Sequence, residues 1–408
     1  MSNPSTVDTL VPDRAAITAV ILGITAFAVA EGLAQPLISL VLASRHVPAS
    51  LIGLNAAAFA FGLGAATLSI SRLTAAASGE KLIIAGLLGA SACMATFALT
   101  DALWIWFAAR VVHGFCASLI FMLSEAWLNA ASTDRVRGRV SGLYGGFLSA
   151  GFAAGPLAIP MFGTAHGFAF ALAAVYVAVV AFITVILVRR TRTKPEPSPA
   201  GGVARFIRAA PLLVAMVVTF GFADVAAVSM MPVYFVRTGH SQAFAAISVT
   251  MMALPTALAQ PLVGVLLDRV SRPIVAIGAC GLAAASFLAI PFLRSEAALL
   301  ADFALLGVGS MALYTAALTL LGESYKGGLL VAGSAAFSLA YAVGSAAGST
   351  STGLAMNLID RSAGPICAGL MLTLFLFLFL VSGAMQARSG SRQPPPSSSQ
   401  PGRSSRVL

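Results

Sequence analysis

The chain has 408 residues, of which 59% are hydrophobic and only 9% are charged. A soluble protein of this length needs far more charged surface, so the composition excludes an ordinary soluble domain. The net charge of +10 could suggest a nucleic-acid partner. We expect none, because the basic residues lie in the connections between apolar segments, where they face lipid headgroups.

Apolar segments of about 20 residues, the length that crosses a bilayer, recur along the whole chain. Open strands cannot satisfy their backbone groups in lipid, so the sequence predicts an all-α polytopic membrane protein. Residues 15–43 are too long for a signal peptide, and acidic residues precede them. Twelve transmembrane helices are predicted, at residues 15–43, 49–77, 81–100, 103–131, 138–163, 166–188, 210–236, 242–267, 273–293, 296–322, 328–356 and 363–386.

One connection, residues 189–209, is much longer than the others and is rich in proline, glycine and basic residues. Such a composition is typical of a linker. It divides the chain into an N-terminal tail (1–14), a six-helix bundle (15–188), the linker (189–209), a second six-helix bundle (210–386) and a disordered tail (387–408).

The distribution of lysine and arginine predicts the orientation in the membrane. Of the 24 such residues, four (Arg45, Arg237, Arg294 and Arg361) fall on one side and Arg110 lies inside a span. The remaining nineteen share the side of the termini. We therefore expect both termini in the cytoplasm.

The two halves look duplicated. A shift of 193 residues maps Glu31 onto Asp224, Gly114 onto Gly307, Gly151 onto Gly344 and Gly155 onto Gly348. Glycines at such spacing let helices approach one another closely, and we expect the same of Gly142, Gly145 and Gly146 in the fifth span. Pro156 is expected to kink that span.

Three charged residues, Glu31, Asp224 and Arg110, lie deep inside predicted spans, where a charge is expensive and usually faces a protein interior or water. The acids could be structural carboxyls paired between helices, or proton carriers whose ionised form burial disfavours. Arg110 could be a structural cation, a modulator of an acid such as Glu31, or a contact for an anionic solute. We assign proton coupling to Glu31, assisted by Asp224 and Arg110.

Seven polar residues inside the spans could contact a solute, although each could equally be a bond between helices. They are Gln35, on the same helical face as Glu31, and Asn55, His113, Tyr144, Gln260, Tyr314 and Tyr341. Near the inner end of the fourth span, Glu125 could anchor the loop that carries Arg137 and Arg139. Alternatively it could form a gate that pairs with these arginines in one state only.

Four passages resemble motifs of the major facilitator superfamily, over nearly the whole chain. They are Arg110-x-x-His113-Gly114; Glu125-Ala-Trp-Leu-Asn followed by Arg137-Gly-Arg139 and Tyr144; Gly151-x-x-x-Gly155-Pro156; and Gly264-x-x-x-Asp268-Arg269-x-x-Arg272. The second is similar to a block of the YcaD-type bacterial branch. The fourth resembles a cytoplasmic loop motif, which implies gating roles for Gly264, Asp268, Arg269 and Arg272. Its counterpart in the first half is degraded, because Ala75 stands where Asp268 does.

The resemblance implies two pseudo-symmetric six-helix bundles that rock about a midplane site. The expected function is secondary active transport of a small organic solute, drug-like or metabolite-like, across the bacterial inner (plasma) membrane, coupled to protons, with export favoured over import. An uncoupled facilitator and a transporter-shaped sensor or assembly protein remain alternatives. We expect no enzyme, because no nucleophile is paired with a base, and no cofactor, metal or catalytic residue. The expected partners are the solute, protons and membrane lipid, and the expected state is a monomer.

Overall fold

The computed structural model describes residues 12–195, 202–326 and 328–390. Twelve of its helices or helical runs are long and apolar enough to cross a membrane. The elements are α1 (Arg14–Ser44), α2 (Ala49–Ala76), α3 (Gly79–Leu99), α4 (Leu103–Ala131), α5 (Asp134–Ala154), η2 (Gly155–Leu157), α6 (Ala158–Phe162), η3 (Ala165–Gly167), α7 (Phe168–Val188), α8 (Val203–Ala209), α9 (Pro211–Val225), η4 (Ala226–Met230), α10 (Met231–Arg237), α11 (Gln242–Arg269), α12 (Arg272–Ala289), η5 (Ile290–Phe292), α13 (Glu296–Ser324), α14 (Gly328–Leu358) and α15 (Ala363–Gly390).

The observed spans confirm the number of predicted transmembrane helices and match their positions to within a few residues. Three spans are composite: α5, η2 and α6 form the fifth, α9, η4 and α10 form the seventh, and α12 and η5 form the ninth. Three details differ from the prediction. α5 begins at Asp134, inside the expected connection, α8 lies inside the expected linker, and α15 runs to Gly390, inside the expected tail. Residues 391–408 lie outside the described part of the chain.

Local signals explain where several helices begin. The side chains of Asp13, Ser241 and Ser295 each accept a hydrogen bond from the backbone N–H group three residues further on, at the first turns of α1, α11 and α13. Such caps satisfy donors that a helix start leaves free. Between α6 and α7 the backbone turns through Gly163 and Gly167 at positive φ, which glycine adopts without strain.

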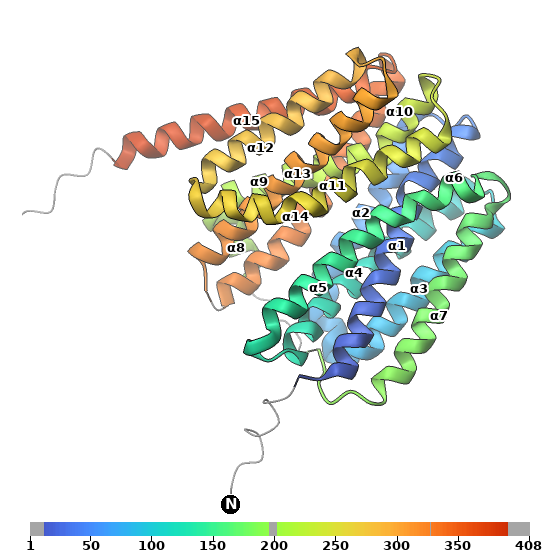
Figure 1. Cartoon of the computed structure of the whole chain (residues 1–408), viewed down its shortest axis with the longest axis vertical. Coiled ribbons are helices and arrows are strands. Elements are labelled where there is room, and N and C mark those ends of the chain that lie inside the picture. Colours follow the sequence, from blue (N-terminus) through green and yellow to red (C-terminus); the bar gives the residue numbers. More distant parts are fainter. Residues whose placement is uncertain (1–11, 196–201, 327, 391–408) are drawn as a thin grey trace, which may run out of the picture.

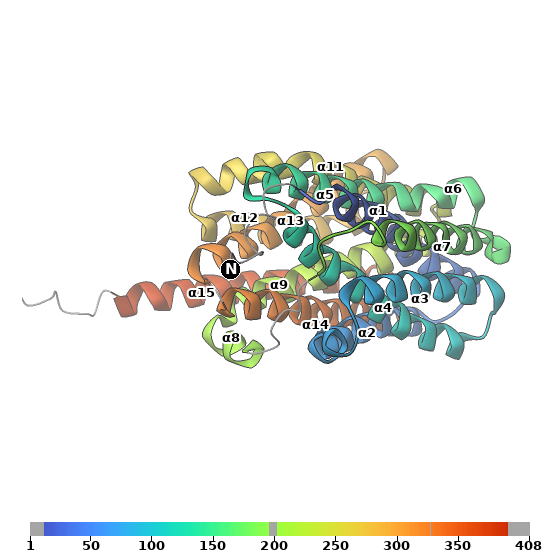
Figure 2. The same cartoon turned by 90° about the horizontal axis from the view of Figure 1, so that it is seen from below.

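The helices form two bundles joined along two seams (Figures 1 and 2). In the N-terminal bundle α1 packs on α5, α4 and α7, and in the C-terminal bundle α9 packs on α14 and α13. In Figure 2 the bundles lie side by side, with α5 next to α11 on one edge and α2 next to α14 on the other. These two helix pairs make most of the contact between the bundles.

Glycines allow the closest helix approaches. A Cβ atom on Gly151 would lie 2.6 Å from the Cβ of Ala28, and one on Gly155 would lie 2.4 Å from the carbonyl oxygen of Val29, so α5 contacts the backbone of α1. Gly114 packs in the same way on Phe59, Gly344 on Val218 and Gly348 on Phe222. Pro156 stands at the start of η2, where the α-helix gives way to a tighter turn. Against the prediction, a Cβ atom added to Gly142, Gly145 or Gly146 of α5 would meet no other atom within 4 Å.

We call the side that carries Arg14 and Arg189 the terminal side, and the side that carries Arg45 and Arg237 the far side. Contacts between the bundles concentrate toward the far side. Thr164 donates to the side chain of Gln242 (2.8 Å), Arg237 donates to the carbonyl of Val47 (3.0 Å), and Thr250 donates to the carbonyl of Ala153 (2.9 Å). In Figure 1 the bundles meet near α6 and α10 and diverge toward the terminal side.

Candidate functional site

A cavity of about 360 Å³ lies between the bundles, near the middle of the spans. Most of its wall is apolar, with phenylalanine and methionine side chains from both halves. Among the described residues that line it, the acids are Glu31 of α1 and Asp224 of α9, and none is a lysine, arginine or histidine. The two acids that the pseudo-repeat pairs therefore share one cavity.

Glu31 belongs to a buried polar network (the Glu31 network), formed with Gln35, Arg110, His113 and Ser229. Glu31 is only 4% exposed, although its side chain contributes to the cavity wall. Gln35 lies one turn further along α1, and its Nε2 donates to Oε1 of Glu31 at 2.5 Å. The other carboxyl oxygen of Glu31 lies 3.4 Å from Nε2 of His113.

Arg110 meets the network through the amide of Gln35 and does not bond Glu31 directly. Its terminal nitrogen donates to Oε1 of Gln35 at 2.7 Å, so one amide connects the acid and the base. The Arg110 guanidinium is 1% exposed and stands 4.7 Å from the ring centroid of Phe59. A buried arginine held in this way offsets part of its desolvation by a charge-assisted hydrogen bond and a cation–π contact.

The network crosses from one bundle to the other at Ser229. The hydroxyl of Ser229 donates to the same oxygen of Gln35 at 3.1 Å. Ser229 belongs to η4, a π-helical turn in which the N–H of Met231 bonds the carbonyl of Ala226, five residues back. π-turns inside α-helices are rare and frequent at functional sites. Gln35 therefore connects Glu31 directly to the contact that Ser229 makes between the bundles.

Asp224 lies across the cavity in a different environment. Its Oδ2 accepts a hydrogen bond from the hydroxyl of Tyr341 at 2.8 Å. The ring of Phe220, one turn earlier on α9, stacks on Tyr314 with centroids 4.7 Å apart and lies 5.7 Å from the ring of Tyr341. All four residues contribute to the cavity wall.

The remaining polar candidates do not line the cavity. Asn55 is buried on α2, and within the described residues neither of its amide atoms has a hydrogen-bond partner. Tyr144 is buried on α5 with its hydroxyl likewise unpaired. Gln260 accepts a hydrogen bond from Thr315 at 3.1 Å, which ties α11 to α13. His113 stands behind Glu31, away from the cavity surface.

The candidate gating residues lie at the terminal-side ends of the helices. Arg272 pairs with Glu323 of α13, a partner that the motif does not contain. Asp268, Arg269 and Arg139 are exposed, and a Cβ atom added to Gly264 would have open space within 4 Å. Glu125 is exposed on α4 and interacts electrostatically with the hydroxyls of Tyr144 and Tyr314. The side chain of Arg137 lies outside the described part of the structure.

Residues 191–195 of the linker are bound to the terminal side of the N-terminal bundle. Oδ2 of Asp13 accepts hydrogen bonds from the backbone of Arg192 (2.6 Å) and of Thr193 (2.9 Å), and the indole of Trp127 donates to the carbonyl of Thr193 (2.9 Å). Lys194 lies 3.7 Å from Glu80. Burial alone would raise the pKa of Asp13, but these bonds and one from Ala16 outweigh burial and hold the pKa below its ordinary value of 3.8.

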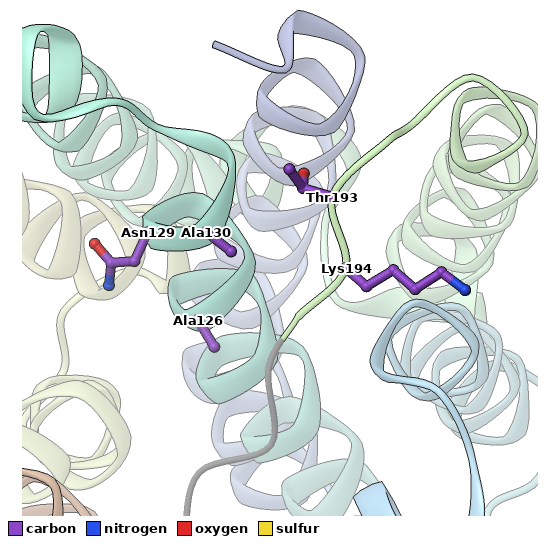
Figure 3. Close-up of a pocket in the computed structure, with 5 residues that line it drawn as sticks. All are labelled: Ala126, Asn129, Ala130, Thr193 and Lys194. Atoms are coloured by element: carbon purple, nitrogen blue, oxygen red, sulfur yellow. The ribbon is translucent and has the colours of Figure 1, made fainter. Parts of the chain in front are cut away.

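A second pocket, of about 410 Å³, lies between this linker segment and α4. Figure 3 shows Thr193 and Lys194 passing beside the turns of α4 that carry Ala126, Asn129 and Ala130, with the Lys194 side chain extending away from α4. The described residues of its lining include no acid, and the pocket lies apart from the intramembrane charges. We therefore place the candidate functional site in the central cavity.

Sequence reasoning missed several residues that complete these clusters. Ser229 and Phe220 carry no charge and stand in apolar runs, so no sequence signal marks them. Asp302 of α13 is an acid inside a predicted span, and its charge could have been noticed from the sequence. Glu323 lies just past the predicted tenth span, in a connection, where charged residues are common.

A family model described as Major Facilitator Superfamily matches residues 20–349 and 237–405. The chain belongs to this superfamily. A curated relative, an uncharacterized MFS-type transporter named YfkF from Bacillus subtilis (strain 168), is 23% identical over 340 residues, covering 81% of this chain and 86% of the relative.

Solved structures of transporters share the fold. The nucleoside transporter NupG superposes with a TM-score of 0.71 at 13% identity, over 90% of this chain and 98% of NupG. A bacterial homologue of the human lysosomal transporter Spinster, in an inward-facing and unoccupied conformation, gives a TM-score of 0.71 at 14% identity, over 93% of this chain and 98% of the homologue. The chain is therefore a multi-pass membrane transporter of the superfamily and not an enzyme.

Proposed function

We propose that this transporter exchanges a small organic solute for protons across the bacterial inner membrane, in the direction of export. Glu31 carries the proton, and Asp224 and Arg110 assist. The observation that supports the proposal is the Glu31 network: a buried acid on the cavity wall, joined through one amide to a buried arginine and to the opposite bundle. The distribution of lysine and arginine supports cytoplasmic termini, so the terminal side is the cytoplasmic side.

Protonation of Glu31 changes the balance of charge in the Glu31 network. With Glu31 ionised, the charges of Glu31 and Arg110 offset each other on the two sides of Gln35. A proton on Glu31 leaves the Arg110 cation buried without a nearby counter-charge, and an uncompensated buried charge is expensive. Protonation therefore favours an arrangement in which this network, including its bond to Ser229, is broken. Such a difference between states is what couples a proton to a conformational change.

The test is transport in liposomes that contain a pH-sensitive dye, with pooled metabolites and drugs added outside. We expect solute-dependent proton flux from the parent protein and loss of that flux from Glu31→Gln, because glutamine keeps the shape of the side chain but cannot carry a proton. Glu296→Gln is the matched control, since Glu296 is an exposed acid at the start of α13. Transport with unchanged pH dependence in Glu31→Gln would refute the role of Glu31. Equilibration of labelled solute without proton flux would identify a facilitator.

A further inference from the structure

We infer that the wall of the cavity formed by the C-terminal bundle is a binding site for an organic ammonium ion on an apolar body. Asp224 provides its counter-charge, and Phe220, Tyr314 and Tyr341 provide its aromatic surface. The inference rests on the proposed transport function and names the class of solute for the same cavity.

The Asp224 carboxyl is the first component of the site. It is half-buried and faces the cavity, and the hydrogen bond from Tyr341 engages Oδ2. None of the described residues that line the cavity is basic. The nearby charged residue of the wall is Glu31, a second acid, and Arg110 is occupied behind it by Gln35. An unpaired buried charge is expensive, so a solute that brings a positive charge to Asp224 offsets that cost.

The aromatic rings are the second component. Phe220 and Asp224 are four residues apart on α9, which places the ring and the carboxyl on one helical face. Tyr314 stacks on Phe220 with an angle of 23° between the rings, and Tyr341 meets Phe220 at 38°. Faces of aromatic rings attract cations, and quaternary ammonium groups are recognised by aromatic side chains in this way. A carboxylate beside three rings is therefore a site for an ammonium group.

The other residues of the cavity wall indicate the chemical character of the rest of the solute. Phenylalanines of both bundles line it together with Met122, Met252 and Met311. Methionine side chains are flexible and polarizable, so they adapt to apolar groups of different shape. Anionic solutes find no basic side chain among the described residues of this wall. The cavity therefore favours a singly charged cation with an apolar body over a neutral sugar-like or an anionic solute.

The two acids take different roles in this arrangement. Glu31 is held by Gln35 and exchanges a proton, whereas Asp224 is open to the cavity and binds the solute. Asp224 assists coupling because a bound cation and a proton both reduce the negative charge of the same cavity. This separation allows the two proposals to fail independently.

The test is isothermal titration calorimetry on the purified protein with three probes that share a phenyl ring. We expect benzyltrimethylammonium to bind at least about tenfold more tightly than benzyl alcohol or benzenesulfonate. Asp224→Asn should weaken binding of the cation by about tenfold or more and leave benzyl alcohol unchanged. Asp302→Asn is the matched control, since Asp302 is an acid within a span of the same bundle that does not line the cavity.

Two further variants keep the result interpretable. Phe220→Leu changes no charge and should weaken binding of the cation by about threefold or more, even if Asp224→Asn proves unstable. Glu31→Gln should lose proton flux and weaken cation binding less than Asp224→Asn does, so proton flux retained in Glu31→Gln rejects only the proposed coupling. Equal affinity for the cation and the alcohol, or an unchanged cation affinity in both Asp224→Asn and Phe220→Leu, would overturn the inference.

Discussion

Gly53 of α2 stands at the closest contact between the bundles, and replacing it with alanine should open the far side. A Cβ atom at this position would lie 2.2 Å from the carbonyl oxygen of Ser349 and 3.0 Å from its carbonyl carbon. An ordinary carbon–oxygen contact is about 3.3 Å, so α2 and α14 must separate by about 1 Å. Both atoms belong to the backbone, and no side-chain rotation can relieve the overlap.

The energy of this overlap decides the size of the effect. Overpacking of this kind costs about 1–3 kcal/mol, which corresponds to a shift of about 5- to 150-fold between two conformations. The shift should favour the arrangement that is open on the far side, because the overlap exists only while α2 and α14 are in contact. Gly64→Ala is the matched control on the same helix, since its Cβ would lie at an ordinary 3.6 Å from Ala342. Both substitutions favour helix formation equally in the two conformations.

The measurement is the distance between spin labels at Leu51 and Asn357, exposed positions near the far-side ends of α2 and α14, with the native cysteines replaced. We expect Gly53→Ala to add a population at longer distance and Gly64→Ala to leave the distribution unchanged. Identical distance distributions in the parent and in Gly53→Ala would show that α2 and α14 accommodate a methyl group without separating. The close approach would then not control which side is open.

Three further predictions concern other contacts. Ser229→Ala removes the hydrogen bond from the C-terminal bundle to the Glu31 network, and a net loss of about 0.5–1.5 kcal/mol should raise the far-side-open population by about two- to tenfold in the same spin-label assay. Gly155→Ala crowds α1 inside one bundle, so it should lower the Tm by a few degrees without shifting the spin-label distances; a shift without destabilisation would contradict this. Asp13→Asn should speed trypsin cleavage after Arg192 severalfold, because a neutral side chain holds the backbone of the linker more weakly than the carboxylate does. In the parent the lowered pKa of Asp13 means that this stabilisation is present above pH 3.8 and is lost only as the pH falls through the folded-state pKa. The rate of cleavage relative to that of an unfolded reference peptide should therefore stay constant between about pH 5 and 8, and faster relative cleavage at the acidic end of that range would count against it.

Consecutive residues determine the length and apolarity of each span, which is why the twelve helices could be predicted. They do not determine the rotation of each helix about its axis, because the lipid-facing and protein-facing sides are both apolar in a membrane protein. Gln35 beside Glu31 follows from a spacing of four residues. Asn55 and Tyr144, in contrast, turn away from the cavity, and nothing in the apolar runs around them indicates this direction.

Contacts between elements far apart in the chain were still harder to predict from the sequence. Glu31 and Arg110 could be named as partners because they belong to one bundle, but the amide between them depends on where α1 and α4 cross. The bond from Ser229 joins bundles separated by the linker, and the pairing of Arg272 with Glu323 depends on how α12 lies against α13. The roles of the gating residues and the assignment to the YcaD-type branch stay predictions.

The π-turn of η4 also changes how the duplicated halves correspond. In the first half the acid Glu31 and its polar neighbour Gln35 are four residues apart, whereas in the second half Asp224 and Ser229 are five apart. A π-turn holds one residue more than an α-turn, so residues five apart share a face there, as residues four apart do elsewhere. The counterpart of Gln35 is therefore Ser229, and the shift of 193 residues, which points to Val228, fails by one position at this turn, although it holds again for Gly307, Gly344 and Gly348 further along the chain. Because Gln35 and Ser229 bond each other, the same position of both repeats forms the two sides of one contact, as equivalent residues do near the two-fold axis of a symmetric dimer.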